Sequence, residues 1–101
     1  RATDLAARLG GDEFALWLDG VATEDVARAR AQALCSGATA ILLTAPGSAD
    51  RVPVSVSVGL AIATPHAKPE TAEAVLARAD AALYAAKRAG RNAWRLAPAA
   101  A

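Results

Sequence analysis

The sequence predicts a mixed α/β fold of the α+β type, with two β-hairpins, two helices and a short last strand along the chain. Three observations carry this prediction: a Gly-Gly pair between two apolar runs, a central run of alternating valines, and a long alanine-rich run at helical spacing. The 101 residues are 54% hydrophobic but only 4% aromatic, which indicates one small domain whose helices pack closely on a sheet.

The first two elements are a hairpin and a helix. The hairpin is predicted over residues 4–9 and 12–19, because two glycines separate these runs and both central residues of a tight turn need positive φ. Residues 23–35 are predicted to be a helix, since Thr23 is a good N-cap and two acids stand in the first turn. The expected apolar stripe of this helix consists of Val26, Ala29, Ala33 and Leu34.

A second hairpin is predicted over residues 39–45 and 52–63, joined by the polar turn PGSADR. Residues 52–63 form the clearest strand, because bulky and small residues alternate along it. The bulky face is Val52, Val54, Val56, Val58, Leu60 and Ile62. The small face would let a helix or a ligand approach closely.

The chain is predicted to end in a long helix and a short strand. Residues 70–89 carry one apolar stripe at helical spacing, and Gly90 is a natural C-terminal stop. The stripe consists of Val75, Leu76, Ala79, Ala82, Leu83 and Ala86. Residues 93–96 are the expected last strand. The domain is therefore predicted to span residues 1–96, followed by a tail over 97–101.

Composition excludes several classes of protein and of site. The net charge of +1 favours neither a nucleic-acid surface nor a basic membrane patch, and no apolar run is long enough to span a bilayer. Cys35 and His66 are the only cysteine and histidine, so we set aside an internal disulfide, a Ser-His-Asp triad and a zinc cluster. The chain begins at Arg1 without an initiator methionine and is expected to be part of a longer protein.

Two adjacent acids, Asp12 and Glu13, follow the glycine pair. A two-residue loop would place Leu9 opposite Asp12 and Arg8 opposite Glu13, so the two carboxylates would point to opposite faces. A carboxylate beside bare glycine backbone suits Mg²⁺, which takes few protein carboxylates and otherwise binds water and phosphate. The pattern alone favours a simpler interpretation, in which Asp12 is solvated and Arg8 and Glu13 form a cross-strand ion pair worth about 0.2–1 kcal/mol.

The segment RLGGDEFALWL resembles the signature of the GGDEF family, the diguanylate cyclases. Near the other end, RADAALYAAKRAGRNAW resembles the last helix of the family and the turn after it, and VPVSVSVGLAIA resembles its penultimate long strand. The resemblance covers residues 1–96 in the right order. It is therefore far more specific than the five signature letters alone.

The resemblance implies a cyclase that condenses two GTP molecules into cyclic di-GMP with Mg²⁺, or alternatively Mn²⁺, and pairs with a second GGDEF domain. It implies that Gly10 and Gly11 pass beneath the nucleotide. Asp12 matches the metal-ligand position, and Glu13 matches the neighbouring acid, linked to catalysis and also a candidate metal ligand. It also implies a cytoplasmic domain, with no nucleic-acid partner and no direct membrane contact from this segment.

Lys87 and Arg91 match the basic residues that hold the terminal phosphates in the family. They lie four apart, as neighbours on one helical face would, although Gly90 stands between them. The alternative is that both are solvated charges near a helix C-terminus, where the helix dipole favours cations.

The first four residues match the RxxD inhibitory site of the family, where cyclic di-GMP binds and stops the cyclase. Arg1 would donate to phosphate or to a guanine edge, and Asp4 would accept from guanine N–H groups. The family site also uses an arginine of the following helix. A gapless count places Gln32 there, with Arg28 and Arg30 on neighbouring turns, so the third partner stays open.

The chain starts later than a complete domain of the family, which carries a first strand and two helices before this point. We therefore expect this chain alone to be inactive. We also expect the strand over 52–63 to lack a neighbour on one edge, and that edge to be covered by another chain or segment. Two functions remain: part of an active, product-inhibited cyclase, or a regulatory module that binds GTP or cyclic di-GMP without catalysis.

Overall fold

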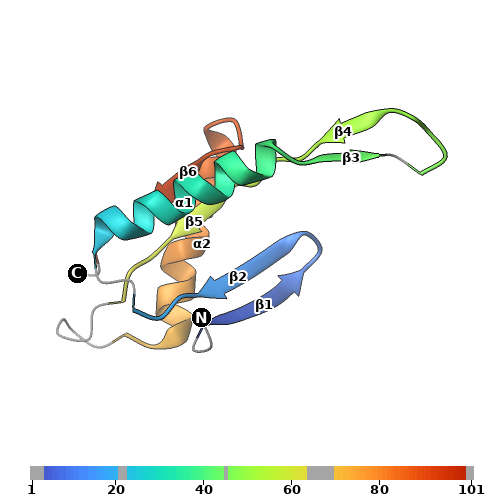
Figure 1. The fold of residues 1–101 in the computed structure, drawn as a ribbon. Helices are drawn as coiled ribbons and strands as arrows, with labels where there is room; N and C mark the ends of the chain where they lie inside the picture. The colour runs from blue at the N-terminus through green and yellow to red at the C-terminus, as the bar shows by residue number, and fades with distance from the viewer. Residues whose placement is uncertain (1–3, 21–22, 45, 64–69, 100–101) are drawn as a thin grey trace.

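The computed structural model describes residues 4–20, 23–44, 46–63 and 70–99, and the mixed α/β class is confirmed. The elements in chain order are β1 (Leu5–Gly10), β2 (Glu13–Trp17), α1 (Glu24–Thr39), β3 (Leu42–Thr44), β4 (Arg51–Pro53), β5 (Val58–Leu60), α2 (Ala72–Arg88) and β6 (Trp94–Leu96). They form three separate two-stranded sheets, β1–β2, β3–β4 and β5–β6 (Figure 1).

The first hairpin is confirmed, but the predicted register is wrong by one residue. Arg8 lies opposite Phe14, where the prediction had Arg8 opposite Glu13, and Gly10 lies opposite Glu13. Leu9 is an extra residue on β1, which makes a β-bulge beside the turn. The prediction assumed that both strands contribute equal numbers of residues to the hairpin. One extra residue on β1 moves the side chains before it to the opposite face of the hairpin relative to β2.

Helix α1 begins as predicted, since the Thr23 hydroxyl accepts a hydrogen bond from the Val26 N–H at 3.2 Å. It runs to Thr39, beyond the predicted end at residue 35. The predicted stripe is wrong, because the buried residues are Ala27, Ala31, Cys35 and Ala38. Small side chains on this face let α1 approach β5 and β6 closely, whereas Val26 and Leu34 are exposed.

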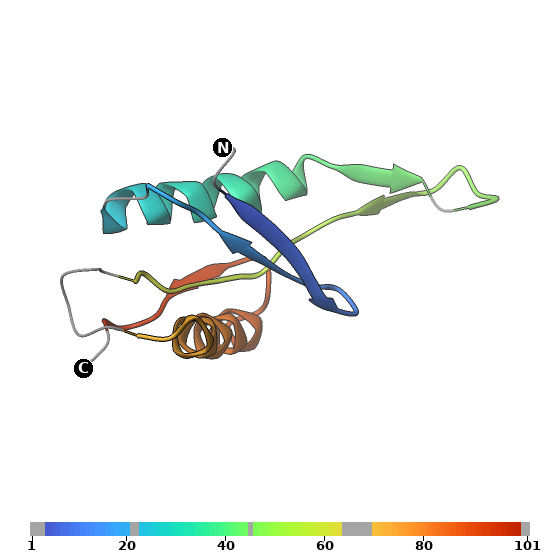
Figure 2. The same ribbon diagram turned by 90° about the horizontal axis from the view of Figure 1, so that it is seen from below.

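The predicted strand over 52–63 is in fact two strands with different partners. Its first part is β4, which pairs antiparallel with β3 in a ribbon that projects beyond the end of α1 (Figures 1 and 2). Its last part contains β5, which pairs parallel with β6 in the body of the molecule. Residues 54–57 between them belong to neither strand. The predicted strand over 39–45 shrinks to β3 because α1 occupies residue 39.

The core is a three-layer arrangement, in which α1 and α2 lie on opposite faces of the β5–β6 pair (Figure 2). Gly59 of β5 is where α2 comes closest. A Cβ at Gly59 would collide with the carbonyl oxygen of Ala79 and the backbone of Leu83. The predicted close approach of a helix to the small-residue face is thereby confirmed.

The predicted last helix and last strand are confirmed as α2 and β6. Every residue of the predicted α2 stripe is buried or half-buried, with Val75, Ala82 and Ala86 the most enclosed. Thr71 caps the helix, its hydroxyl accepting from the Ala74 N–H at 3.1 Å. Just after β6, the Ala97 N–H donates to the Leu60 carbonyl at 2.7 Å.

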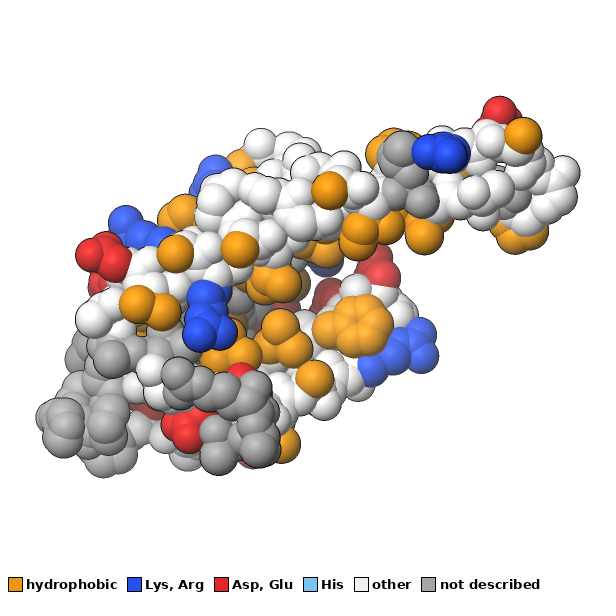
Figure 3. All heavy atoms as spheres, in the orientation of Figure 1, with side chains coloured by type: hydrophobic (Ala, Val, Ile, Leu, Met, Phe, Trp, Pro, Cys, Tyr) orange, Lys and Arg blue, Asp and Glu red, His pale blue; other side chains and the backbone are white. Residues whose placement is uncertain are grey.

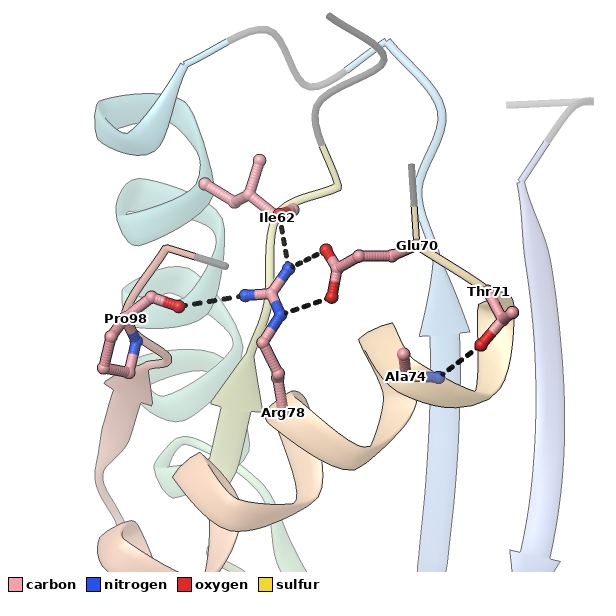
Figure 4. A network of polar contacts seen from close by, with 6 residues as sticks. All are labelled: Ile62, Glu70, Thr71, Ala74, Arg78 and Pro98. Carbon is pink, nitrogen blue, oxygen red and sulfur yellow. Dashed lines mark hydrogen bonds and ion pairs between the residues drawn. The ribbon is translucent and has the colours of Figure 1, made fainter. Parts of the chain in front are cut away.

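Arg78 of α2 joins three segments through one guanidinium (Figure 4). It donates to both carboxylate oxygens of Glu70, at 2.7 and 2.9 Å, and to the carbonyls of Ile62 at 2.8 Å and Pro98 at 3.1 Å. The hydrogen bonds from Arg78 lower the pKa of the Glu70 carboxyl and raise that of the guanidinium. Arg78 therefore fixes the end of the β5 segment and the chain after β6 against α2.

Large apolar side chains are exposed along the first hairpin and the lower side of α1, where they are visible in Figure 3. Leu5 is 67% and Phe14 68% exposed, and the buried core consists mainly of alanines. The surface area of 7337 Å² compares with about 5,300 Å² for a compact monomer of 10.2 kDa. A surplus of about 2,000 Å² follows from that relation, which is the area of a substantial interface.

Candidate functional site

The glycine turn leaves open space on its surface. Gly11 has a φ of 53° and Gly10 a φ of 149°, both in the region that favours glycine, and a Cβ on either would meet no atom within 4 Å. Arg8 closes the turn, its Nε and Nη2 donating to the Gly11 carbonyl at 3.0 and 2.8 Å. The turn is thus held from within the hairpin, and its backbone is accessible to a ligand.

The two acids of the motif have different surroundings. Asp12 is an exposed turn residue, whereas Glu13 opens β2 and is half-buried. An Oε of Glu13 lies 3.7 Å from Nζ of Lys87, so its cationic partner comes from α2 and not from the predicted Arg8. The side chains of this pair are 43% and 30% exposed, which screens the attraction and keeps it weak. The pair nevertheless brings the acidic turn together with the end of α2.

Arg91 follows Lys87 through a defined helix ending. The Gly90 N–H donates to the Lys87 carbonyl at 3.3 Å, and the Arg91 N–H donates to the Ala86 carbonyl at 3.2 Å. These are the two bonds of a Schellman motif, and Gly90 takes the positive φ of 113° that the motif requires. Gly90 therefore ends the helix as predicted, while the motif keeps the Arg91 backbone folded onto the last turn of α2.

The turn continues with two residues in left-handed conformation, which the sequence reasoning missed. Arg91 has a φ of 65° and Asn92 a φ of 46°, the only non-glycine residues with positive φ in the described ranges. Asparagine tolerates this region better than most residues, so the Gly-Arg-Asn run was the available signal. This backbone reverses the chain from α2 into β6.

The acids present fit a partial magnesium site. Among the described residues no group of three histidines, cysteines or acids is placed to hold a metal ion. Asp12 is exposed beside open glycine backbone and suits an ion that takes most of its ligands from water and phosphate. Glu13 is already engaged with Lys87.

Of the two residues predicted for the inhibitory site, the structure describes only Asp4. Arg1 lies outside the described residues. Asp4 accepts a hydrogen bond from the Asp19 N–H at 2.8 Å, which ties the start of β1 to the segment after β2. Of the candidates for the third partner, Gln32 contacts β6, where its Oε1 accepts from Trp94 Nε1 at 2.9 Å. Arg28 pairs with Glu24 at 3.3 Å on the surface of α1.

Cys35 lies on the buried face of α1, and this burial raises the pKa of its thiol. Within the described part of the chain, neither helix is long and apolar enough to cross a membrane.

Comparison with known proteins gives a consistent answer. The family model described as "Diguanylate cyclase, GGDEF domain" matches residues 1–93. The chain is 40% identical over 97 residues to the diguanylate cyclase TpbB of Pseudomonas aeruginosa and 33% identical over 93 residues to the response regulator PleD of Caulobacter vibrioides. These matches cover 96% and 92% of this chain but only 21% and 20% of the two relatives.

A solved structure agrees with the sequence matches. It is the GGDEF domain of DgcB from Caulobacter crescentus in complex with c-di-GMP, which superposes with a TM-score of 0.76 at 33% identity. The match covers 93% of this chain and 51% of the solved one. The chain thus spans about half of a solved domain and about a fifth of its curated relatives.

Proposed function

The chain belongs to the GGDEF family of diguanylate cyclase domains, and from this premise we propose that it forms part of a cyclase that condenses two GTP molecules into cyclic di-GMP. The observation that carries the proposal is the approach of Glu13 to Lys87, because it brings the accessible glycine turn, two acids and the basic end of α2 to one place. Open backbone and cations suit the phosphates of a nucleoside triphosphate, and carboxylates suit the magnesium ion that accompanies them.

Each residue of this site has a proposed role. Gly10 and Gly11 pass beneath the nucleotide, and their open surface supports this role. Lys87 and Arg91 hold the terminal phosphates, and the Schellman motif supports this role because it folds the Arg91 backbone onto the last turn of α2. Glu13 acts beside the reacting groups, with Lys87 as the cation that orients its carboxylate.

The reaction requires two such sites facing each other. The 3′-hydroxyl of one GTP forms a bond to the α-phosphorus of the other, the hydroxyl proton leaves, and pyrophosphate departs. A second such step, in which the other 3′-hydroxyl attacks the remaining α-phosphorus and a second pyrophosphate departs, closes the ring. Each domain of a homodimer therefore holds one GTP. Mg²⁺, or alternatively Mn²⁺, would supply charge neutralisation on the phosphates, and Asp12 is the residue best placed to hold it, with Glu13 as the second candidate.

We further propose that Arg1 and Asp4 belong to a product-inhibition site. The hydrogen bond from Asp19 to Asp4 supports this role, because it orients one carboxylate oxygen at the start of β1. The third partner stays open: Gln32 is hydrogen-bonded to Trp94 and Ser36, and Arg28 pairs with Glu24. We also propose that residues 1–96 form the domain and that residues 97–101 are its tail. Since its substrate would be GTP, the domain is proposed to act in the cytoplasm.

The chain alone is proposed to be inactive. Among the described residues the first hairpin makes no strand pairing with β5, and the chain as a whole exposes about 2,000 Å² more than a compact domain of its mass. A further part of the domain that covers this surface would also complete the set of carboxylates around the metal. A second function, a regulatory module that binds GTP or cyclic di-GMP without catalysis, is less favoured because both motif acids are intact.

The test compares two polypeptides with GTP and Mg²⁺, namely this chain and a whole domain that contains it. Cyclic di-GMP is measured by liquid chromatography. We expect product only from the whole domain, and none after Asp12→Asn, while Asp50→Asn on the exposed β3–β4 ribbon should leave turnover unchanged. Product from this chain alone would contradict its inactivity. Binding of GTP without product in the whole domain would favour the regulatory function.

A further inference from the structure

A groove of about 560 Å³ lies between α1 and β6, and no residue of the glycine turn lines it. Its strand side is the unbroken run from Asn92 to Leu96, and its helix side is Arg28, Gln32 and Cys35, which share one face of α1. The groove therefore follows the chain from Asn92 to Leu96, as a channel with the face of α1 on its other side. Such a channel fits an extended chain better than a compact ligand.

The free edge of β6 borders this groove. The Val58 N–H donates to the Ala93 carbonyl at 2.9 Å, and the Ala97 N–H donates to the Leu60 carbonyl at 2.7 Å, so residues 93 and 97 face β5. Because the backbone groups of a strand alternate in direction, those of Trp94 and Leu96 point away from β5. No strand pairs with β6 on that side among the described residues. The edge thus offers backbone donors and acceptors to an added strand.

The charges around the groove have one sign. Arg28 and Arg95 line it, and none of its lining residues is acidic. Arg95 Nη1 donates to the Trp94 carbonyl at 2.8 Å, which holds a positive charge directly at the edge. Arg28 is half exposed, and its Nη2 forms an ion pair with an Oε of Glu24 on the same helix at 3.3 Å. Carboxylates on a strand lying in the groove would meet both guanidiniums.

The width of the groove is fixed by one contact between its walls. The Trp94 indole N–H donates to the Gln32 carboxamide oxygen at 2.9 Å, which ties β6 to α1. A second bond from Gln32 Nε2 to the Ser36 hydroxyl, at 3.0 Å, holds the carboxamide in place. The groove is therefore preformed, which lowers the entropic cost of binding.

We propose that the α1–β6 groove binds an extended acidic peptide segment of a partner protein by β-strand addition to the edge of β6. The backbone of the segment pairs with Trp94 and Leu96, and its carboxylates lie against Arg28 and Arg95. This recognition uses residues distinct from those proposed to hold GTP. It would connect the domain to a regulatory partner without occupying the site proposed for GTP.

The test is a fluorescence anisotropy titration of this chain with a labelled peptide rich in glutamate and valine. Three matched probes or variants are compared: the same peptide with alternate backbone N–H groups methylated, the double variant Arg28→Glu with Arg95→Glu, and the control Arg30→Glu. Arg30 is exposed on α1 but does not line the groove. We expect methylation and the double variant each to weaken binding at least about tenfold, and Arg30→Glu to change it by less than about threefold.

A second measurement covers the case in which the double variant fails to fold. In the wild-type chain, hydrogen exchange at the Trp94 and Leu96 amides should slow at least tenfold when the acidic peptide is bound, while Arg95 and Ala97 should change little. No binding at millimolar peptide, equal binding of the methylated peptide, or equal losses for the groove and control variants would each overturn the proposal.

Discussion

Replacing Gly59 by alanine tests the packing that brings α2 onto β5. The added Cβ would collide with the carbonyl oxygen of Ala79 and with backbone atoms of Leu83, which are not the mobile ends of side chains. The helix would have to move away from the strand, and overpacking of this kind costs about 1–3 kcal/mol or more. For a domain of this size, each kcal/mol lowers the midpoint of thermal unfolding by about 4–8 °C.

Gly37→Ala is the matched control for Gly59→Ala. Gly37 lies within α1, and a Cβ there meets no atom within 4 Å. The same chemical change should therefore stabilise the protein, by about 0.5–1 kcal/mol, because alanine loses less backbone entropy in a helix. Thermal unfolding followed by circular dichroism measures both variants. A midpoint for Gly59→Ala equal to or above the wild-type value would refute the close approach of α2 to β5.

Four other outcomes are expected. Arg78→Ala should destabilise the protein by about 3 kcal/mol, measured by urea unfolding, because it leaves the Ile62 and Pro98 carbonyls and a carboxylate without their donor. The pKa of Glu70 lies below its ordinary 4.5, so the stability it adds is present above pH 4.5 and is lost as the pH falls through the lowered value; Glu70→Gln should remove that dependence. Gly11→Val should destabilise the turn by about 1–2 kcal/mol, since φ is 53° there, and an unchanged unfolding midpoint would contradict this. Lys87→Met should raise the dissociation constant for GTP in the whole domain about 10- to 100-fold, whereas Arg88→Met should not.

Local chemistry made the element types predictable. The Gly-Gly turn, the two threonine caps, and Gly90 at the end of α2 all act within a few residues of the chain. The stripe of α2 was equally predictable, because this helix is packed on one continuous face.

Long-range geometry accounts for the errors. The bulge at Leu9 shifted the register of the first hairpin, and alternation alone does not reveal an extra residue. The valine-rich run over 52–63 has strand periodicity throughout, but its two ends pair with different partners. The stripe of α1 was misjudged because alanines, not the larger Val26 and Leu34, face β5 and β6.

The candidate site was predictable in part. The glycine turn and the basic end of α2 were found from sequence, yet the contact between Glu13 and Lys87 joins residues far apart in the chain and needed the fold. The α1–β6 groove was not found, since none of its residues forms a recognisable motif along the sequence.

Product formation by the whole domain tests the central claim most directly. With GTP and Mg²⁺ present, liquid chromatography should show cyclic di-GMP and pyrophosphate from the wild type, and neither product from the Asp12→Asn variant. Absence of cyclic di-GMP from the folded wild-type domain, or undiminished synthesis by Asp12→Asn, would contradict the assignment of a cyclase site to the glycine turn.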